Sequence, residues 1–387
     1  MSVRVDPQFL TEIKKYGVVN VEKCFNCGNC TAICPLSTSS ETFPRRLIRY
    51  AQLGLKEQLL SSKELWLCYY CGECTQTCPQ QADPGEFMAT ARRYAIASYD
   101  SLGLAKLLYT SPTLSTIFLV LLAFVIGFGA YSFHGPMTAD TLKFFDFIPS
   151  STIHTFGVVG MVIVAVLILM GMVNMIVKVR GEGMKGIRTN WMNAIWEAIV
   201  VQALFQRRFQ RDCEAGSVKQ AWYLQKWFIH ASTLWGFLGL LLATVLDYGL
   251  ELLGVKPTGT WVPFWNPIRL LGTIAGLLLV YGTSMSLIRR IRKTDESTAH
   301  STVSDWAFLI LLWLTGISGF MLEIAVYLPN PAPWAYWTLL SHISVAAELL
   351  LLFPFTKFAH AIYRTIALYF HALKPVPVTE PAKAGTD

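Results

Sequence analysis

Polar and apolar positions divide this chain into a mixed first quarter and a long succession of apolar segments. Residues 1–105 mix charged and apolar positions, with helix-like stretches at 43–60 and 84–98. The apolar segments then lie at 113–133, 153–177, 223–248, 267–289, 304–328 and 335–364. Each has close to the ~20 residues that a helix needs to cross a bilayer. The pattern predicts an all-α protein: a small helical domain over 1–105, a six-helix transmembrane bundle over 106–374, and a flexible tail over 375–387.

Composition favours a membrane protein over a soluble one. Of the 387 residues, 53% are hydrophobic and only 15% are charged, and the mean hydropathy is +0.43. A soluble chain of this length does not carry so much apolar sequence. The net charge of +7 would suit nucleic acid, but the basic residues gather in two loops between apolar segments. We therefore expect membrane lipid, and no nucleic acid, as a partner.

The basic residues also predict the orientation of the chain. The loop after the second segment carries Lys178, Arg180, Lys185, Arg188, Arg207, Arg208, Arg211, Lys219 and Lys226. The loop after the fourth segment carries Arg289, Arg290, Arg292 and Lys293. Between the first and second segments the only basic residue is Lys143, and between the fifth and sixth there is none. The first ten residues lack an apolar signal-peptide core. By the positive-inside rule, we expect a multi-pass protein of the cytoplasmic (inner) membrane with both termini in the cytoplasm.

Residues 190–211 form an apolar stretch that is too polar at its end to cross a membrane. Trp191, Ile195, Ile199 and Leu204 would lie near one another on a helix surface. We interpret the stretch as a helix lying in the membrane interface. An ordinary packed cytoplasmic helix is the alternative.

Eight of the nine cysteines form two copies of one motif. The spacing C-x2-C-x2-C-x3-C-P occurs from Cys24 to Pro35 and again from Cys68 to Pro79. Three cysteines of such a motif surround one [4Fe–4S] cluster, and the fourth ligates the other cluster. The predicted ligands of the first cluster are Cys24, Cys27, Cys30 and Cys78. Those of the second cluster are Cys68, Cys71, Cys74 and Cys34.

Alternative chemistry for the cysteines has weaker support in the sequence. Zinc sites use paired cysteines or cysteine–histidine pairs rather than three cysteines followed by Cys-Pro. Cys213, the ninth cysteine, is interpreted as a plain thiol. The chain has no G-x-G-x-x-G fingerprint, no P-loop and no consecutive-cysteine motif. We therefore predict an electron-transfer subunit, with no flavin and no terminal catalytic site on this chain.

Histidines in the apolar segments are candidate haem ligands, because an intramembrane histidine is a functional hypothesis by default. His342 and His360 are 18 residues apart, which is five helical turns and roughly 27 Å of rise, shortened by a bend at Pro354. Two histidines on one helix face at two depths predict two stacked b haems, the alternative being two unrelated polar residues. By topology His230 pairs with His360 near the cytoplasmic side.

The outer pair is less firmly defined by topology. His154 begins the second segment on the outer side and is the predicted partner of His342, with His134 as the competitor. His300 and His371 are expected to lie outside the haem sites.

The membrane segments resemble a known haem protein. The stretch from Phe353 to His360, together with His342, resembles the last haem-binding helix of the gamma subunit of respiratory nitrate reductase. Phe228-Ile229-His230 is similar to the haem-ligand region of that family's second helix. That family carries a second histidine where Leu240 stands here, so the outer haem uses a different ligand or is absent.

The first ~100 residues resemble the iron–sulfur C subunit of heterodisulfide reductase, through the cysteine motifs, Trp66-Leu67-Cys68 and the stretch from Ala91 to Ala95. Over about residues 20–370 the fusion is similar to the C subunits of quinone-interacting membrane-bound oxidoreductases. The resemblance implies a bis-[4Fe–4S] ferredoxin-like domain and a dihaem cytochrome b domain. It also implies menaquinone, flavoprotein sister subunits on the cytoplasmic side, and electron exchange with adenylylsulfate reductase in sulfate metabolism.

Acidic residues suggest where quinol would lose its protons. Asp247, Glu323 and Glu348 are predicted near the outer haem, although each could instead be an ordinary interfacial or hydrogen-bonded carboxylate. A competing quinone site lies by the inner haem, beneath residues 190–211, with Glu197 or His371 nearby.

Two alternative functions of the chain remain. One is a heterodisulfide-reductase-like or nitrate-reductase-gamma-like subunit that serves another partner, and the other is a membrane anchor whose cysteines bind zinc.

Overall fold

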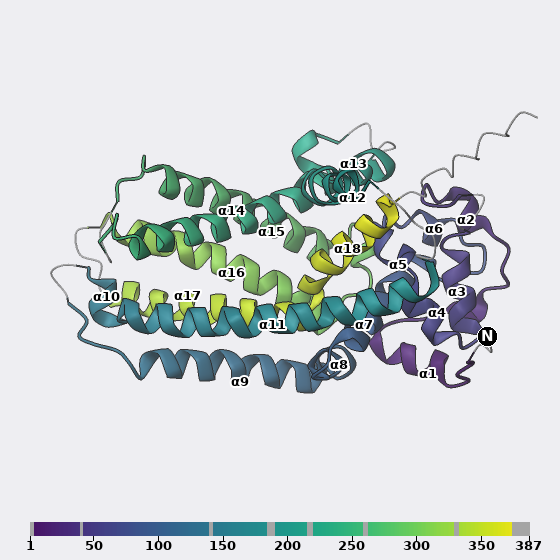
Figure 1. Ribbon diagram of the computed structural model, residues 1–387, viewed down its shortest axis with the longest axis horizontal. Coiled ribbons are helices and arrows are strands. Elements are labelled where there is room, and N and C mark those ends of the chain that lie inside the picture. The colour runs from purple at the N-terminus through teal and green to yellow at the C-terminus, as the bar shows by residue number, and fades with distance from the viewer. Residues whose placement is uncertain are drawn as a thin grey trace, which may run out of the picture.

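The computed structural model describes residues 4–38, 42–138, 142–183, 190–214, 220–257, 262–328 and 333–373. Every regular element in these ranges is helical, which confirms the all-α prediction. A group of short helices lies at one end of an elongated molecule, and a bundle of long helices extends from it (Figure 1). Lys185, Arg188, Lys219 and the predicted tail over 375–387 lie outside the described residues, as do the side chains of Arg180 and Cys213.

The N-terminal domain is built from short helices around one longer helix. The short ones are α1 (Phe9–Ile13), η1 (Lys14–Tyr16), η2 (Val21–Lys23), α2 (Asn29–Ile33), α3 (Arg45–Gln52), α4 (Lys56–Ser61), α5 (Glu64–Leu67) and α6 (Glu73–Gln76). The longer one, α7 (Pro84–Tyr99), starts well because Asp83 caps it and Pro84 occupies its first turn. Helix α8 (Leu104–Thr110) then leads towards the bundle.

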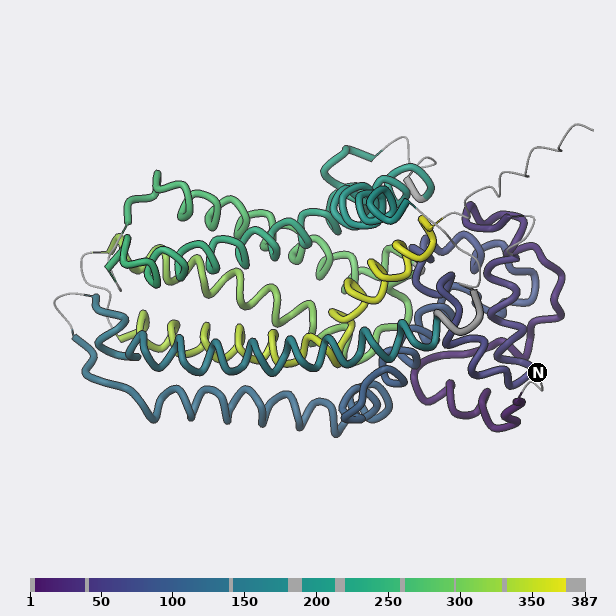
Figure 2. The backbone as a smooth tube through the Cα atoms, in the orientation of Figure 1, coloured from purple at the N-terminus to yellow at the C-terminus, as the bar shows by residue number. Residues whose placement is uncertain are grey.

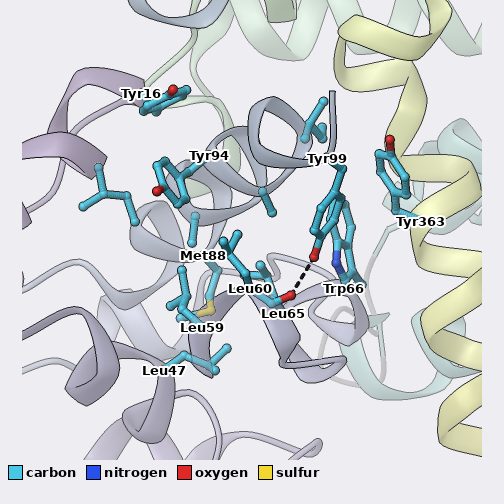
Figure 3. Packing of buried hydrophobic residues seen from close by; sticks show 14 of the residues in the cluster. Tyr16, Leu47, Leu59, Leu60, Leu65, Trp66, Met88, Tyr94, Tyr99 and Tyr363 are labelled. Carbon is cyan, nitrogen blue, oxygen red and sulfur yellow. Dashed lines mark hydrogen bonds between the residues drawn. The ribbon is translucent and has the colours of Figure 1, made fainter. Parts of the chain in front are cut away.

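Aromatic side chains form much of the core of this domain. The Tyr94 ring lies edge-on to Phe9 and to Tyr16, with ring centroids 5.4 and 5.2 Å apart. Figure 3 shows this packing around α7, together with Trp66 and Tyr99 on its other side. Edge-on aromatic pairs add to the stabilisation from burial alone. The cysteine loops are therefore attached to a rigid, well-packed support.

Five helices of the described chain are long and apolar enough to cross a membrane. They are α9 (Pro112–Tyr131), α11 (Ser150–Gly183), α14 (Lys226–Leu252), α15 (Pro267–Arg292) and α16 (Val303–Ala325). The short elements α10 (Phe144–Phe147), η4 (Trp222–Leu224) and η5 (Glu296–Thr298) lie between them. The prediction of six such helices was wrong, because the last predicted segment is interrupted. The chain is a multi-pass membrane protein by these helices, and its orientation stays a prediction.

The interruption of the last segment occurs around Pro354. Helix α17 (Trp334–Leu351) is followed by two 3₁₀ turns, η6 (Phe353–Phe355) and η7 (Lys357–Ala359), and then by α18 (His360–Ala372). Proline lacks the N–H that a continuous helix needs, and Thr356 adopts an extended backbone with φ −112° and ψ −174°. Figure 2 shows α18 leaving the direction of α17. The prediction that His342 and His360 share one helix was therefore wrong.

Close contact between α14 and α15 fixes the position of the helix that carries His230. Gly236 of α14 lies against the backbone of Ala275 and Leu279, and Gly282 of α15 lies against Thr233. A Cβ atom at either glycine would collide with these neighbours. Small residues allow such close helix packing within membranes.

Residues 190–211 cross the end of the bundle that faces the N-terminal domain (Figure 1). They form α12 (Trp191–Ile195), the π-helical element η3 (Trp196–Leu204) and the start of α13 (Arg207–Glu214). Trp191 and Trp196 are exposed, whereas Ala194 and Ala198 are buried, and η3 packs against α18. Trp191, Ile195 and Ile199 of the predicted apolar face are exposed, as a helix in the membrane interface requires.

Two sets of contacts hold the N-terminal domain against the bundle. The Tyr363 ring of α18 lies 5.3 Å from Trp66 and 5.2 Å from Tyr99, measured between centroids (Figure 3). Arg93 of α7 bridges Glu86, at 2.9 Å, and Asp305 of α16, at 3.1 Å. The relative position of the two domains is thus set by buried aromatic and ionic contacts.

Candidate cofactor sites

The two cysteine loops have the same backbone shape. Gly28 (φ +87°) and Gly72 (φ +96°) precede α2 and α6, and both adopt the left-handed conformation that glycine tolerates best. Asn26 and Tyr70, at equivalent positions two residues earlier, also have positive φ, +67° and +57°. This shared shape turns each loop around one point, as wrapping three thiolates around a cluster requires.

The cysteines gather into two groups, each with one member from the other motif. Burial raises the pKa of the Cys30 thiol, and repulsion from Cys24, Cys27 and Cys78 raises it further. These four cysteines are the Cys24 set. The remaining four are the Cys68 set: Cys34, Cys68, Cys71 and Cys74.

The Cys68 set shows the same electrostatic signature. Burial raises the pKa of Cys34 to about 12, with smaller contributions from Cys68 and Cys71. Burial and then the neighbouring thiols, Cys68 first, raise the pKa of Cys74. A cluster binds its cysteines as thiolates, so cluster binding at this site would release the thiol protons.

A cavity lies among the four cysteines of the Cys68 set. It is lined by these cysteines and by apolar side chains that include Ile33, Phe43 and Met88. The backbone N–H of Tyr70 donates to Cys68 Sγ at 3.3 Å, and such bonds tune cluster potentials. The residues present therefore fit a [4Fe–4S] cluster.

A zinc ion needs its sulfur ligands about 2.3 Å from one point. No group of three or more histidine, cysteine, aspartate or glutamate side chains converges on a single metal ion among the described residues. A cubane cluster distributes its thiolates over four irons and needs no such convergence.

His230 and His360 are brought together at the end of the bundle near the N-terminal domain. Their ring centroids are 6.3 Å apart, with 65° between the ring planes. His230 Nδ1 bonds to Gln206 Oε1 at 2.9 Å, and His360 Nδ1 bonds to the Lys357 carbonyl. These bonds leave the Nε2 atom of each ring for a metal, in the arrangement that metal-binding histidines use.

Two buried donors near this pair lack hydrogen-bond partners. They are Gln206 Nε2 and Arg364 Nη2, neither of which bonds to any described residue. Gln206 also has φ +50°, which is uncommon for this residue type. Buried unsatisfied donors are rare and call for an explanation such as an absent ligand group.

His342, His154 and His134 have three different surroundings. His342 Nδ1 bonds to Ser318 Oγ of α16 at 2.8 Å. His154 of α11 faces α14, with its Nε2 3.8 Å from Glu251 and its ring 4.5 Å from that of Tyr248. The His134 ring stacks on Tyr131 at 4.1 Å. The pairing of His342 with His154 stays a prediction.

Two of the three predicted quinol carboxylates are ion-paired. Asp247 pairs with Lys256 at 2.7 Å, and Glu323 pairs with Arg269 at 3.3 Å. Glu348 is 2% exposed, and its carboxylate has no hydrogen bond or ion pair to any described residue. Of the three, Glu348 is the carboxyl whose burial needs a functional explanation.

The competing inner-site residues also have partners. Glu197 accepts from Gln202 at 2.7 Å, and Arg208 lies 3.0 Å from His371 Nε2. His300 is 3.7 Å from Asp83 at the surface of the N-terminal domain. Sequence reasoning missed Gln206 and Arg364, since neither belongs to a recognisable motif.

Comparison with known protein families matches two separate parts of the chain. Residues 20–82 match the model of the 4Fe–4S dicluster domain, and residues 109–377 match that of citrate utilization protein B. The chain belongs to the citrate utilization protein B family. In this member of the family, a 4Fe–4S dicluster domain with eight cysteines precedes the matched region. By this match the chain carries an iron–sulfur electron-transfer domain, and the zinc-anchor alternative is not supported.

Individual relatives are similar to one part of this family member or the other. The C subunit of H(2):CoB-CoM heterodisulfide,ferredoxin reductase from Methanothermobacter thermautotrophicus is 38% identical over 63 residues, 16% of this chain and 34% of that protein. A protein of Archaeoglobus profundus, named as similar to the heterodisulfide reductase C subunit, is 38% identical over 101 residues, 24% of this chain and 54% of that protein. Citrate utilization protein B of Escherichia coli is 28% identical over 155 residues, 40% of this chain and 39% of that protein.

The chain spans between about a third and about a half of the length of these relatives. No solved structure matches it. The predicted likeness to the C subunit of heterodisulfide reductase is confirmed for the iron–sulfur domain. For the membrane domain, the matching family is citrate utilization protein B, where the sequence resemblance had suggested the nitrate reductase gamma subunit.

Proposed function

We propose that this chain transfers electrons between menaquinol in the membrane and a reductase in the cytoplasm. The path comprises a b haem held by His230 and His360 and two [4Fe–4S] clusters held by the Cys24 and Cys68 sets. The observation that carries the proposal is the His230–His360 pair itself, beside an iron–sulfur domain.

The geometry of the histidine pair supports haem ligation. Two imidazoles on one metal, with bonds of about 2.0–2.1 Å, place their ring centres about 6 Å apart. The observed separation is 6.3 Å. When bound, a b haem supplies a reversible one-electron carrier whose potential depends on its axial ligands and surroundings.

The residues around the pair support the same assignment. Gln206 and Lys357 hold the two imidazoles in the tautomer that leaves Nε2 unprotonated. The unpartnered Gln206 Nε2 and Arg364 Nη2 are suitable donors for the two propionate carboxylates of a haem. A bound haem would therefore account for the hydrogen-bonded Nδ1 atoms of the two histidines and for the two donors that lack partners.

A second b haem, with His342 and His154 as ligands and His134 as the alternative to His154, belongs to the same proposal. His342 is supported by its bond to Ser318, which leaves Nε2 available. Leu240, at the position of the expected second histidine, packs in an apolar cluster with Leu279 and Leu312.

Quinol oxidation is proposed at the outer side, where Glu348 would accept a proton. Its burial without a partner supports this role, whereas Asp247 and Glu323 are ion-paired. The finer assignment, a C subunit of a quinone-interacting membrane-bound oxidoreductase that serves adenylylsulfate reductase through flavoprotein sister subunits, rests on the resemblance of the fused architecture. The proposed orientation keeps both termini cytoplasmic, with the domains divided near residue 105. It requires α17 to cross together with the five longer helices, and α17 does return the chain to the end of the bundle at which α9 starts (Figure 1).

Visible absorption and iron analysis of the purified full chain test the proposal. We expect b-type haem bands, broad cluster absorbance, and about eight non-haem irons per chain. Adding a reduced menaquinone analogue should reduce the haem. A preparation with full iron–sulfur content but without haem bands would refute the quinol-to-haem path.

A further inference from the structure

The loop that begins at Cys68 contacts the helix that carries His360. Arg364 follows His360 by four residues on α18, so the two lie on the same helix face. Arg364 Nη1 donates to the carbonyl of Cys68 at 3.0 Å and to that of Trp66 at 2.8 Å. One side chain thus joins the histidine helix directly to a cysteine of the Cys68 set.

The same loop also approaches His230 through aromatic rings. Tyr69 stacks on Phe209, with ring centroids 5.2 Å apart and 6° between the planes. Phe209 meets the His230 ring edge-on at 6.0 Å. The Arg364 guanidinium lies 4.2 Å from the centroid of the Tyr69 ring. Arg364 therefore contacts both the carbonyl groups of the cysteine loop and the aromatic rings that lead to His230.

The Cys24 set lies on a different part of the domain surface. Cys27 is exposed, whereas no cysteine of the Cys68 set is. Phe25, next to Cys24, is 61% exposed. Helix α5, which ends just before Cys68, packs against α18 (Figure 1). The two sets thus differ in their surroundings: the Cys24 set reaches the surface at Cys27, and the Cys68 set contacts the helix that carries His360.

We propose that the Cys68 set exchanges electrons with the histidine pair, that Arg364 positions it for this exchange, and that the Cys24 set is the solvent-facing end of the chain. This inference rests on the proposed function, because it requires iron at all three places. With both groups bound, one electron would pass from the iron held by His230 and His360 to the cluster held by the Cys68 set, so that the first loses one electron and the second gains it. No bond breaks and no proton moves.

Arg364 has a further consequence for the Cys68 set. Arg92 of α7 donates to the same Cys68 carbonyl at 2.6 Å, so two cations lie beside one cluster ligand. Positive charge and hydrogen bonding near a cluster favour its reduced form. Removing Arg364 should therefore lower the potential of this cluster as well as loosen its contact with α18.

Flash photoreduction of the full, cofactor-loaded chain tests the order of the sites. A low-potential soluble donor reduces the exposed cluster, and haem reduction is followed optically. Cys71→Ser should lower the rate of haem reduction to that of a Cys27→Ser/Cys71→Ser double variant. Cys27→Ser alone should slow haem reduction less than Cys71→Ser does, because the cluster of the Cys68 set remains next to the histidine pair. The opposite pattern, or equal effects of the two single variants, would overturn the inference.

Arg364 is tested with all cysteines intact. Arg364→Gln should slow haem reduction and lower the potential of one cluster in redox titrations followed by electron paramagnetic resonance. Arg364→Lys should restore the potential more than the rate, since it keeps the charge but loses the two-carbonyl contact. Arg45→Gln is the matched control, because Arg45 lies beside Gly28 in the other loop; it should shift only the other cluster.

These outcomes are distinct from failure of the proposed function. If the wild-type chain lacks haem bands or cluster iron, the proposed function itself is wrong, whatever the order of electron transfer between the sites. If both cofactors are present and Arg364→Gln leaves the rate and both potentials unchanged, only the inference fails.

Discussion

Replacing Arg93 should loosen the N-terminal domain from the membrane bundle. Arg93 is 8% exposed and bridges Glu86 and Asp305, whose side chains are 1% and 3% exposed. Arg93→Met leaves Glu86 buried without a cation, whereas Asp305 keeps its ion pair with Lys357 at 3.0 Å. Breaking a buried ion pair from one side costs about 3–5 kcal/mol. At about 1.4 kcal/mol per factor of ten, open states of this junction become roughly 100 to several thousand times more populated.

Hydrogen exchange of the full chain measures this opening, with exchange in α7 as the readout. Lys178→Gln is the control, because Lys178 and Glu57 also link the bundle to the N-terminal domain but are 30% and 61% exposed. Such a pair is worth about 0–1 kcal/mol. Adding Glu86→Gln to Arg93→Met should recover part of the loss, since one orphaned carboxylate becomes neutral. Equal exchange in Arg93→Met and Lys178→Gln would refute the reasoning.

Three further predictions concern the cofactors. Cys78→Ser should damage the cluster of the Cys24 motif and spare that of the Cys68 motif, as seen by electron paramagnetic resonance; the reverse result would mean that the ligands do not cross over. His230→Ala should remove one b-type haem band and stop electron flow to the clusters, and a variant with full haem content would exclude the His230 pairing. Glu348→Gln should slow quinol oxidation in oriented vesicles without loss of haem, and in the native chain this oxidation should release protons outside and respond to membrane potential at about 2.3 kcal/mol per charge per 100 mV. Turnover that ignores the potential and acidifies only the cytoplasmic face would move the quinone site inside.

Two features of the sequence predicted the structure reliably: the spacing of the cysteine motifs and the length of the apolar segments. The double cysteine motif predicted a two-cluster domain, and the family comparison confirms it. Five of the six apolar segments became long helices because each has enough apolar residues to span a bilayer. Both signals are local: they depend on the order of residues along the chain and not on what lies beside them.

The parts that sequence could not predict depend on tertiary contacts. Gln206 was part of a stretch interpreted only as interfacial, and nothing in its neighbourhood signals that its side chain orients His230. Arg364 is the last residue of the predicted sixth segment and belongs to no motif. Its contact with the Cys68 carbonyl joins residues almost 300 positions apart, which neither periodicity nor motif spacing reveals.

The interruption at Pro354 gives these separate observations one structural cause. A continuous helix through this segment would have carried Arg364 along the axis of α17. Because the two 3₁₀ turns intervene, α18 takes a new direction towards α5 and η3. The same change of direction places the His360 ring beside that of His230, and Arg364 beside Cys68. The sixth apolar segment thus fails as a simple membrane span at the point where its residues join the two candidate cofactor sites.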